Sequence, residues 1–131
     1  MSALGAARMH LAKAREFLTA AELALDLELF NAAASNAVIS GINSKDAICL
    51  RLTGRSTKAD DHSSAVAELR VAGGTGPHGA ATKQAAATLG RLLKMKSRSQ
   101  YQTIDVAPAD ATRAFEWAQR LLVAATDIVR G

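Results

Sequence analysis

The chain has 131 residues, of which 49% are hydrophobic, 4% are aromatic and one is a cysteine, Cys49. These values predict one helical domain over residues 1–131, and they exclude a disulfide framework and a core of bulky β-strand residues. No apolar run approaches the roughly 20 residues that cross a bilayer, and charges such as Arg8 and Lys13 interrupt the N-terminus, so we expect a soluble cytoplasmic protein without a membrane partner.

Charge is unevenly distributed around the net value of +4. No acidic residue occurs between Glu68 and Asp105. Such a stretch attracts polyanions, including RNA and DNA, although a solubilising helix face has the same composition. With Tyr101 as the one aromatic nearby, contact with a phosphate backbone is easier to justify than base stacking. The cations of this stretch are Arg70, Lys83, Arg91, Lys94, Lys96 and Arg98.

The first element is predicted as a helix over residues 3–28. Leucines recur every seven residues from Leu4 to Leu25, and alanines lie between them. This repeat is typical of a seam that faces the core or a second subunit. A second helix follows over residues 31–52, and the small residues of its first half permit close helix crossing. Its polar residues, Asn36, Asn43, Ser44 and Asp46, need hydrogen-bond partners or a partly wet cleft.

Residues 54–62 join the second helix to a third and carry a fixed cation, Arg55, and a titratable imidazole, His62. Arg matches phosphate geometry, and His changes protonation near neutral pH, so the pair suits metal-free phosphodiester chemistry. The alternative is an exposed polar loop. Asp60 or Asp61 can cap the third helix, which stops at the glycine-rich segment 73–79.

Two more helices complete the pattern. The fourth is predicted over residues 80–97, a polar connection over 97–107, and the fifth from Pro108, which suits a first helical turn. No strand pattern is present. The sequence therefore predicts an all-α, up-and-down bundle of four to five helices.

Several segments, in this order, resemble the HEPN superfamily (higher eukaryotes and prokaryotes nucleotide-binding). An aromatic and a small polar residue open the Ala/Ser-rich stretch 29–37, and residues 45–48 continue it. Residues 61–66 are similar to the family's His-Ser helix start, residues 92–101 to its segment ending in Tyr, and residues 106–129 to its closing helix. The chain resembles a diverged bacterial member.

The resemblance implies a homodimer. In many members it also implies a metal-independent ribonuclease whose Arg and His have four to six residues between them. Arg55 and His62 satisfy that spacing. His62 would transfer the proton of a ribose 2′-hydroxyl, and Arg55 would stabilise the charged phosphorane. Arg51 and Lys58 could hold neighbouring phosphates. However, the pair lies in mid-chain rather than at a C-terminal helix, and Lys96 and Gln100 stand where relatives often have Arg and Asp.

These departures favour a noncatalytic binding module over the ribonuclease. The module would bind a nucleotide, RNA or a nucleotidyltransferase-type antitoxin partner through a polar and basic cleft. A third alternative is a structural bundle that self-associates through its Leu/Ala seam. No cofactor is expected, and the three histidines are too scattered to predict a metal site. Besides Arg55 and His62, the candidate ligand-binding residues are Asp46, Arg51, Lys58, Lys96, Arg98 and Tyr101.

Overall fold

The computed structural model describes residues 1–58, 61–100 and 105–131, with the backbone alone described for 97–100. Within these ranges the fold is all-α, as predicted, with five helices packed as a bundle and no strand. The helices are α1 (Ala3–Asp26), α2 (Phe30–Thr53), α3 (His62–Ala72), α4 (Gly79–Gln100) and α5 (Pro108–Arg130).

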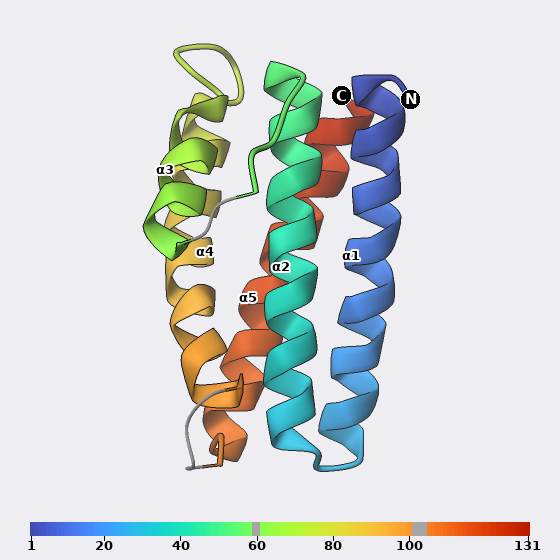
Figure 1. The fold of residues 1–131 in the computed structure, drawn as a ribbon, viewed down its shortest axis with the longest axis vertical. Coiled ribbons are helices and arrows are strands. Elements are labelled where there is room, and N and C mark those ends of the chain that lie inside the picture. The colour runs from blue at the N-terminus through green and yellow to red at the C-terminus, as the bar shows by residue number, and fades with distance from the viewer. Residues whose placement is uncertain (59–60, 101–104) are drawn as a thin grey trace.

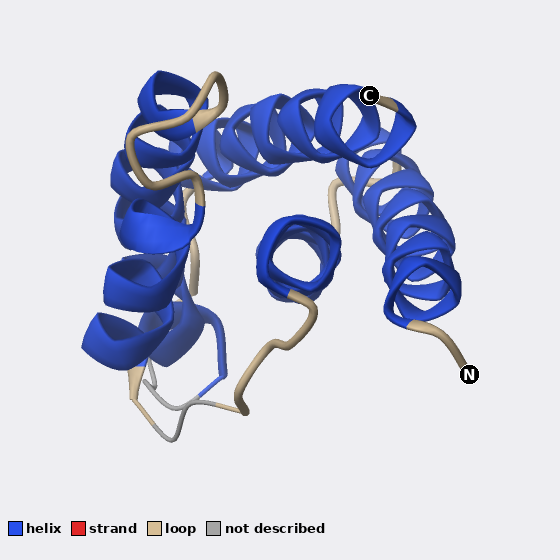
Figure 2. Ribbon diagram, turned by 90° about the horizontal axis from the view of Figure 1, so that it is seen from above, coloured by secondary structure: helices blue, strands red, loops and turns tan. Residues whose placement is uncertain are grey.

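Helix α2 is the central element of the bundle. Seen from above, it lies end-on inside an arch that the other helices form (Figure 2). Successive helices run in opposite directions, except that α2 and α3 point the same way because the connection after α2 returns along the bundle (Figure 1). This return brings residues 55–58 alongside α2, where the candidate site lies.

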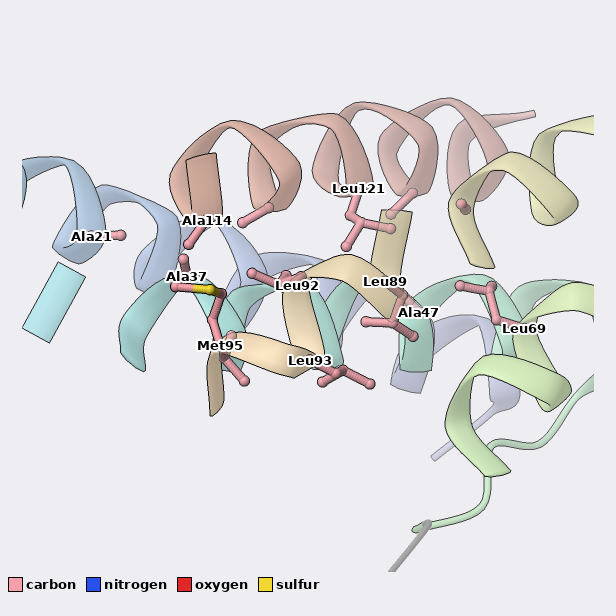
Figure 3. Packing of buried hydrophobic residues seen from close by; sticks show 14 of the residues in the cluster. Ala21, Ala37, Ala47, Leu69, Leu89, Leu92, Leu93, Met95, Ala114 and Leu121 are labelled. Carbon is pink, nitrogen blue, oxygen red and sulfur yellow. The ribbon is translucent and has the colours of Figure 1, made fainter. Parts of the chain in front are cut away.

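Small side chains let the helices around α2 approach closely. Ala33, Ala34 and Ala37 are fully buried. At Gly41 a Cβ atom would lie 2.4 Å from Cδ2 of Leu92 and 3.2 Å from Cδ1 of Leu121, so this position requires glycine-sized volume. Leu92 of α4 and Leu121 of α5 point into the same interior (Figure 3). The core is thus built from many small side chains and a few large aliphatic side chains that pack closely.

The Leu/Ala seam of α1 faces the interior of the bundle. Ala7, Ala14 and Ala21 are fully buried and Leu11 retains 5% exposure, whereas Leu4 at the helix start is 37% exposed. The Ser40 hydroxyl of α2 donates a 2.7 Å hydrogen bond to the carbonyl of Ala14. The seam is therefore used for packing within the subunit, which leaves little of it for a second copy.

The helix ends largely follow the predicted signals. Asp61 caps α3 by accepting a 2.7 Å hydrogen bond from the backbone N–H of Ser64. Gly54 ends α2 with a left-handed φ of 80°, which favours glycine. Pro108 is the first residue of α5. The largest difference is at α4, which continues to Gln100, so the predicted polar connection from Ser97 begins as helix.

Candidate functional site between α2, α3 and α4

A buried ammonium group organises the contact between α2 and α3. Lys45 of α2 is 2% exposed. Its Nζ lies 2.6 Å from Oε1 of Glu68 on α3, and it donates hydrogen bonds to Oγ of Ser56 at 2.8 Å and to the carbonyl of Thr57 at 3.1 Å. A buried charge is tolerated when it is paired and hydrogen-bonded in this way.

The connection between the two helices is bonded to the same charges. The Ser56 hydroxyl donates to Oδ1 of Asp46 at 2.6 Å. The backbone N–H of Thr57 donates to Oε1 of Glu68 at 3.1 Å, and the Thr57 hydroxyl donates to Oε2. We name these five residues, Lys45, Asp46, Ser56, Thr57 and Glu68, the Lys45 cluster. It fixes the first part of the connection against both helices.

The cluster changes the titration of its members. Burial acts to raise the pKa of Glu68, but the Lys45 ammonium and the two Thr57 donors outweigh burial and lower this pKa from 4.5 to about 2. Beneath the cluster, burial raises the pKa of the Cys49 thiol to about 12; the Lys45 charge opposes the rise, and the carboxylates of Glu68 and Asp46 add to it. Glu68 is therefore ionised at neutral pH, and Cys49 is an unreactive thiol.

The polar network extends to α1. Nδ1 of His10 lies 2.9 Å from Oδ1 of Asn43 and 3.8 Å from Oδ2 of Asp46. Asn43 donates its own amide to the carbonyl of Ile39. Asp46 therefore links the connection after α2 to a histidine of α1. Asn43 and Asp46 thus have the partners predicted for the polar residues of α2, whereas the buried Ser44 hydroxyl has no hydrogen-bond partner among the described residues.

A pocket of about 300 Å³ opens beside the Lys45 cluster. Its apolar wall consists of Ile42, Ala65, Leu89 and Leu93, and residues of α2, of the connection, of α3 and of α4 supply its polar groups. This volume lies at the lower end of the range for small-molecule sites. The polar lining residues are Lys45, Asp46, Thr57, Lys58, Asp61, His62 and Lys96.

The structure brings four of the eight predicted site residues together, because Asp46, Lys58, His62 and Lys96 all line this pocket. Arg55 is exposed and Arg51 is half-buried, and neither is among the lining residues. The side chain of Arg98 and all of Tyr101 lie outside the described residues. Within this chain, the candidate catalytic pair is therefore divided: His62 lines the pocket, and Arg55 is not among the lining residues.

Sequence reasoning missed the residues that hold the site in shape. Lys45 was noted only within a family-like segment, and Glu68 only as the end of the acid-free stretch. A lysine inside an otherwise apolar or small-residue helix face was the available signal, because such a lysine needs an acidic partner. Across the described ranges, His, Cys, Asp and Glu do not gather in groups of three or more that could hold a metal ion.

The N-terminus of α3 lies at the pocket, and a helix N-terminus favours a bound anion. His62 is the first residue of this helix, and the first turns of a helix present free N–H groups and partial positive charge. Asp61 already accepts hydrogen bonds from the backbone and side chain around Ser64 and Ser63, and these bonds lower its pKa. Lys58 and His62 form no hydrogen bond or ion pair with any described residue, so both side chains are available to a ligand.

The family model of the HEPN domain matches residues 7–128. This range spans all five helices and includes the Lys45 cluster and the pocket. The chain therefore belongs to the HEPN domain family, which confirms the resemblance seen in the sequence. The family implies roles related to nucleotides or RNA. No curated protein matches the chain. Among the described helices, none is long and apolar enough to span a membrane.

Proposed function

We propose that this chain is a binding module for a small phosphate-bearing ligand, with a nucleotide as the ligand class, and that the pocket between α2, α3 and α4 is its site. The observation that carries the proposal is the convergence of Lys58, His62 and Lys96 from three different segments on one pocket. Two side chains that can be cationic next to a helix N-terminus suit a phosphate, and the apolar wall suits the flat face of a base.

The charges of the pocket divide into structural and ligand-directed groups. The charge of Lys45 is neutralised by Glu68 at 2.6 Å and Asp46 at 3.5 Å, so this lysine holds the wall in place. Asp61 is occupied by its capping bonds. Lys58 on the connection and His62 on α3 then supply the contacts to phosphate, and the Lys45 cluster holds the segment before Lys58 in position.

The test is calorimetric titration of the chain with adenosine 5′-monophosphate, adenosine and inorganic phosphate. We expect the monophosphate to bind at least about tenfold more tightly than adenosine, because one charge-assisted hydrogen bond contributes about 1.5–3 kcal/mol. Lys58→Ala and His62→Ala should each weaken the monophosphate about tenfold. Lys13→Ala on α1, which removes the same charge elsewhere, is the control. Equal binding of adenosine and its monophosphate would contradict the proposal.

A second candidate is the metal-independent ribonuclease with Arg55 and His62. It is favoured by one observation: His62 lines a pocket while Arg55, seven residues earlier, is exposed and available to a neighbouring subunit. In a homodimer, Arg55 of one subunit would then serve His62 of the other. The test is cleavage of labelled RNA in the presence of a chelator. Loss of cleavage in both His62→Ala and Arg55→Ala, with cleavage kept in Arg8→Ala, would establish this activity. Absence of cleavage by the wild type would leave the binding module.

A further inference from the structure

A second and larger hollow lies on the other side of α4. It is a groove of about 490 Å³ between α4 and α5. Arg91 and Gln84 of α4 and Arg120 of α5 line it, and alanines such as Ala81 and Ala124 make up much of the remainder. The residues of α4 that line this groove are different from those that line the α2–α3–α4 pocket. The two hollows are therefore separate sites.

The groove carries two arginines, Arg91 and Arg120. Among the described residues, neither Arg91 nor Arg120 forms an ion pair or a side-chain hydrogen bond, and no acidic residue lines the groove. Both side chains are exposed. The acidic residues of α5 nearest in sequence, Glu116 and Asp127, are not part of the lining. Such a site attracts anions instead of completing an internal salt bridge.

The charge continues along α4 beyond the groove. The helix contains no Asp or Glu, and Lys83 and Lys94 are also exposed. At 3.6 residues per turn, these two lysines lie about 60–80° around the helix axis from Arg91. From Lys83 to Lys94 the helix rises about 17 Å, since each residue adds about 1.5 Å. Exposed cations spread over this length match a ligand with repeated negative charges better than a single small anion.

We propose that the α4–α5 groove binds the phosphodiester backbone of single-stranded nucleic acid through Arg91 and Arg120, without sequence preference. Guanidinium groups match phosphate geometry, and the alanine lining allows a strand to approach the helix backbones closely. Among the residues that the structure describes, no aromatic one lines the groove, so these residues offer bases no stacking platform there. Alanine also offers little apolar area to anchor a partner helix, which makes an acidic peptide the weaker occupant.

The proposal is tested by fluorescence anisotropy with a labelled 20-nucleotide oligouridine between 50 and 300 mM salt. Each single-strand phosphate contact contributes about 0.7 to the slope of log affinity against log salt. Arg91→Ala with Arg120→Ala should therefore reduce the slope by about 1.4 and weaken binding at low salt by about tenfold or more. The matched control is Arg8→Ala with Lys13→Ala, two exposed α1 residues that remove the same net charge; it should keep the wild-type slope.

Four further measurements test whether binding depends on the groove. Arg91→Lys with Arg120→Lys should keep most of the slope, and circular dichroism should show every variant folded. In a Lys58→Ala with His62→Ala background, Arg91→Ala with Arg120→Ala should still reduce the slope by about 1.4, which separates this groove from the pocket proposed above. Equal losses in the groove and control variants would mean diffuse charge attraction and would overturn the proposal. Displacement of the oligouridine by polyglutamate at equal charge would instead assign the groove to an acidic peptide and overturn it as well.

Discussion

The two halves of α2 make their contacts by different physical means. In the first half, Ala33, Ala37 and Gly41 are buried against neighbouring helices by size alone. In the second half, Lys45 is buried as a charge, and its contact with α3 depends on Glu68 and on the connection that follows α2. The first contact is governed by volume, and the second by complete pairing of polar groups.

This difference determines what each half can do. A contact between small apolar groups tolerates no extra volume but has no electrostatic requirement. A buried ion pair adds little net stability over an apolar pair of similar volume. Removing one partner, however, lowers the free energy of unfolding strongly, because the other charge stays buried without its partner. The ion-paired half therefore specifies where Ser56 and Thr57 lie, and Thr57 and the adjacent Lys58 supply part of the pocket. The small-residue half provides the rigid frame.

Removal of Glu68 should give the largest effect. Glu68→Ala leaves the Lys45 ammonium buried with Asp46 at 3.5 Å as its nearest remaining carboxylate. We expect the free energy of unfolding to fall by about 3–5 kcal/mol, measured by urea denaturation. Glu22→Ala, at an exposed position of α1, is the control and should change it by less than about 0.5 kcal/mol.

The double variant Lys45→Met with Glu68→Leu sharpens the same comparison. Because it removes both charges and retains volume, it should recover most of the lost stability. It should also weaken binding in the pocket if the cluster positions Lys58. A loss below about 1 kcal/mol in Glu68→Ala would show that the two halves of α2 do not differ in this way.

A pair of glycine substitutions tests the small-residue half. Both glycines are helical, but a Cβ at Gly41 would lie 2.4 Å from buried Leu92, whereas at Gly90 its nearest contact is Val66 at 3.8 Å. Gly90→Ala should raise the free energy of unfolding by about 0.5–1 kcal/mol, because alanine favours the helix. Gly41→Ala should lower it by about 1 kcal/mol, because overpacking outweighs that gain. Equal stabilisation by both changes, in thermal or urea unfolding, would show that the α2–α4 contact is loose.

The smallest expected effect is the change in the free energy of unfolding as the pH is lowered. The pKa of Glu68 is about 2 in the folded chain and 4.5 ordinarily, so its contribution is complete above pH 4.5 and is lost as the pH falls toward 2. A quarter of the side chain is exposed, and solvent screening reduces the size of this contribution. The difference in unfolding free energy between the wild type and Glu68→Gln should narrow over this range. A constant difference would contradict the lowered pKa.

Much of the fold followed from local patterns. The heptad spacing of leucines, the glycine-rich segment 73–79 and Pro108 each act within a few residues, and the helix ends they predict differ from the observed ends by at most three residues. The common direction of α2 and α3 did not follow, because it depends on contacts of the connection with both helices.

Only part of the candidate site could be predicted from the sequence, because the rest depends on contacts between segments that are distant in the chain. Asp46, Lys58, His62 and Lys96 were chosen by residue type and family resemblance, and they meet in one pocket. Arg55 was chosen for its spacing from His62, but spacing along a connection does not fix direction, and the Lys45 cluster sets the path of the chain there. Lys45 and Glu68 are 23 residues apart in sequence, and no local pattern joins them. In the α4–α5 groove, Arg91 belonged to the noticed basic stretch, whereas Arg120 came from a different helix.

Cys49 lies fully buried beside Glu68, with a thiol pKa of about 12. The modification rate of Cys49 can therefore be used to measure how often the fold opens. A thiol reagent in excess can modify this residue only during moments when the neighbouring helices separate, so the labelling rate of the native chain reports the frequency of that opening. Because Cys49 is the one cysteine in the sequence, every modified molecule records the same event. A ligand that holds α2, α3 and α4 together would lower the rate at which the reagent modifies Cys49.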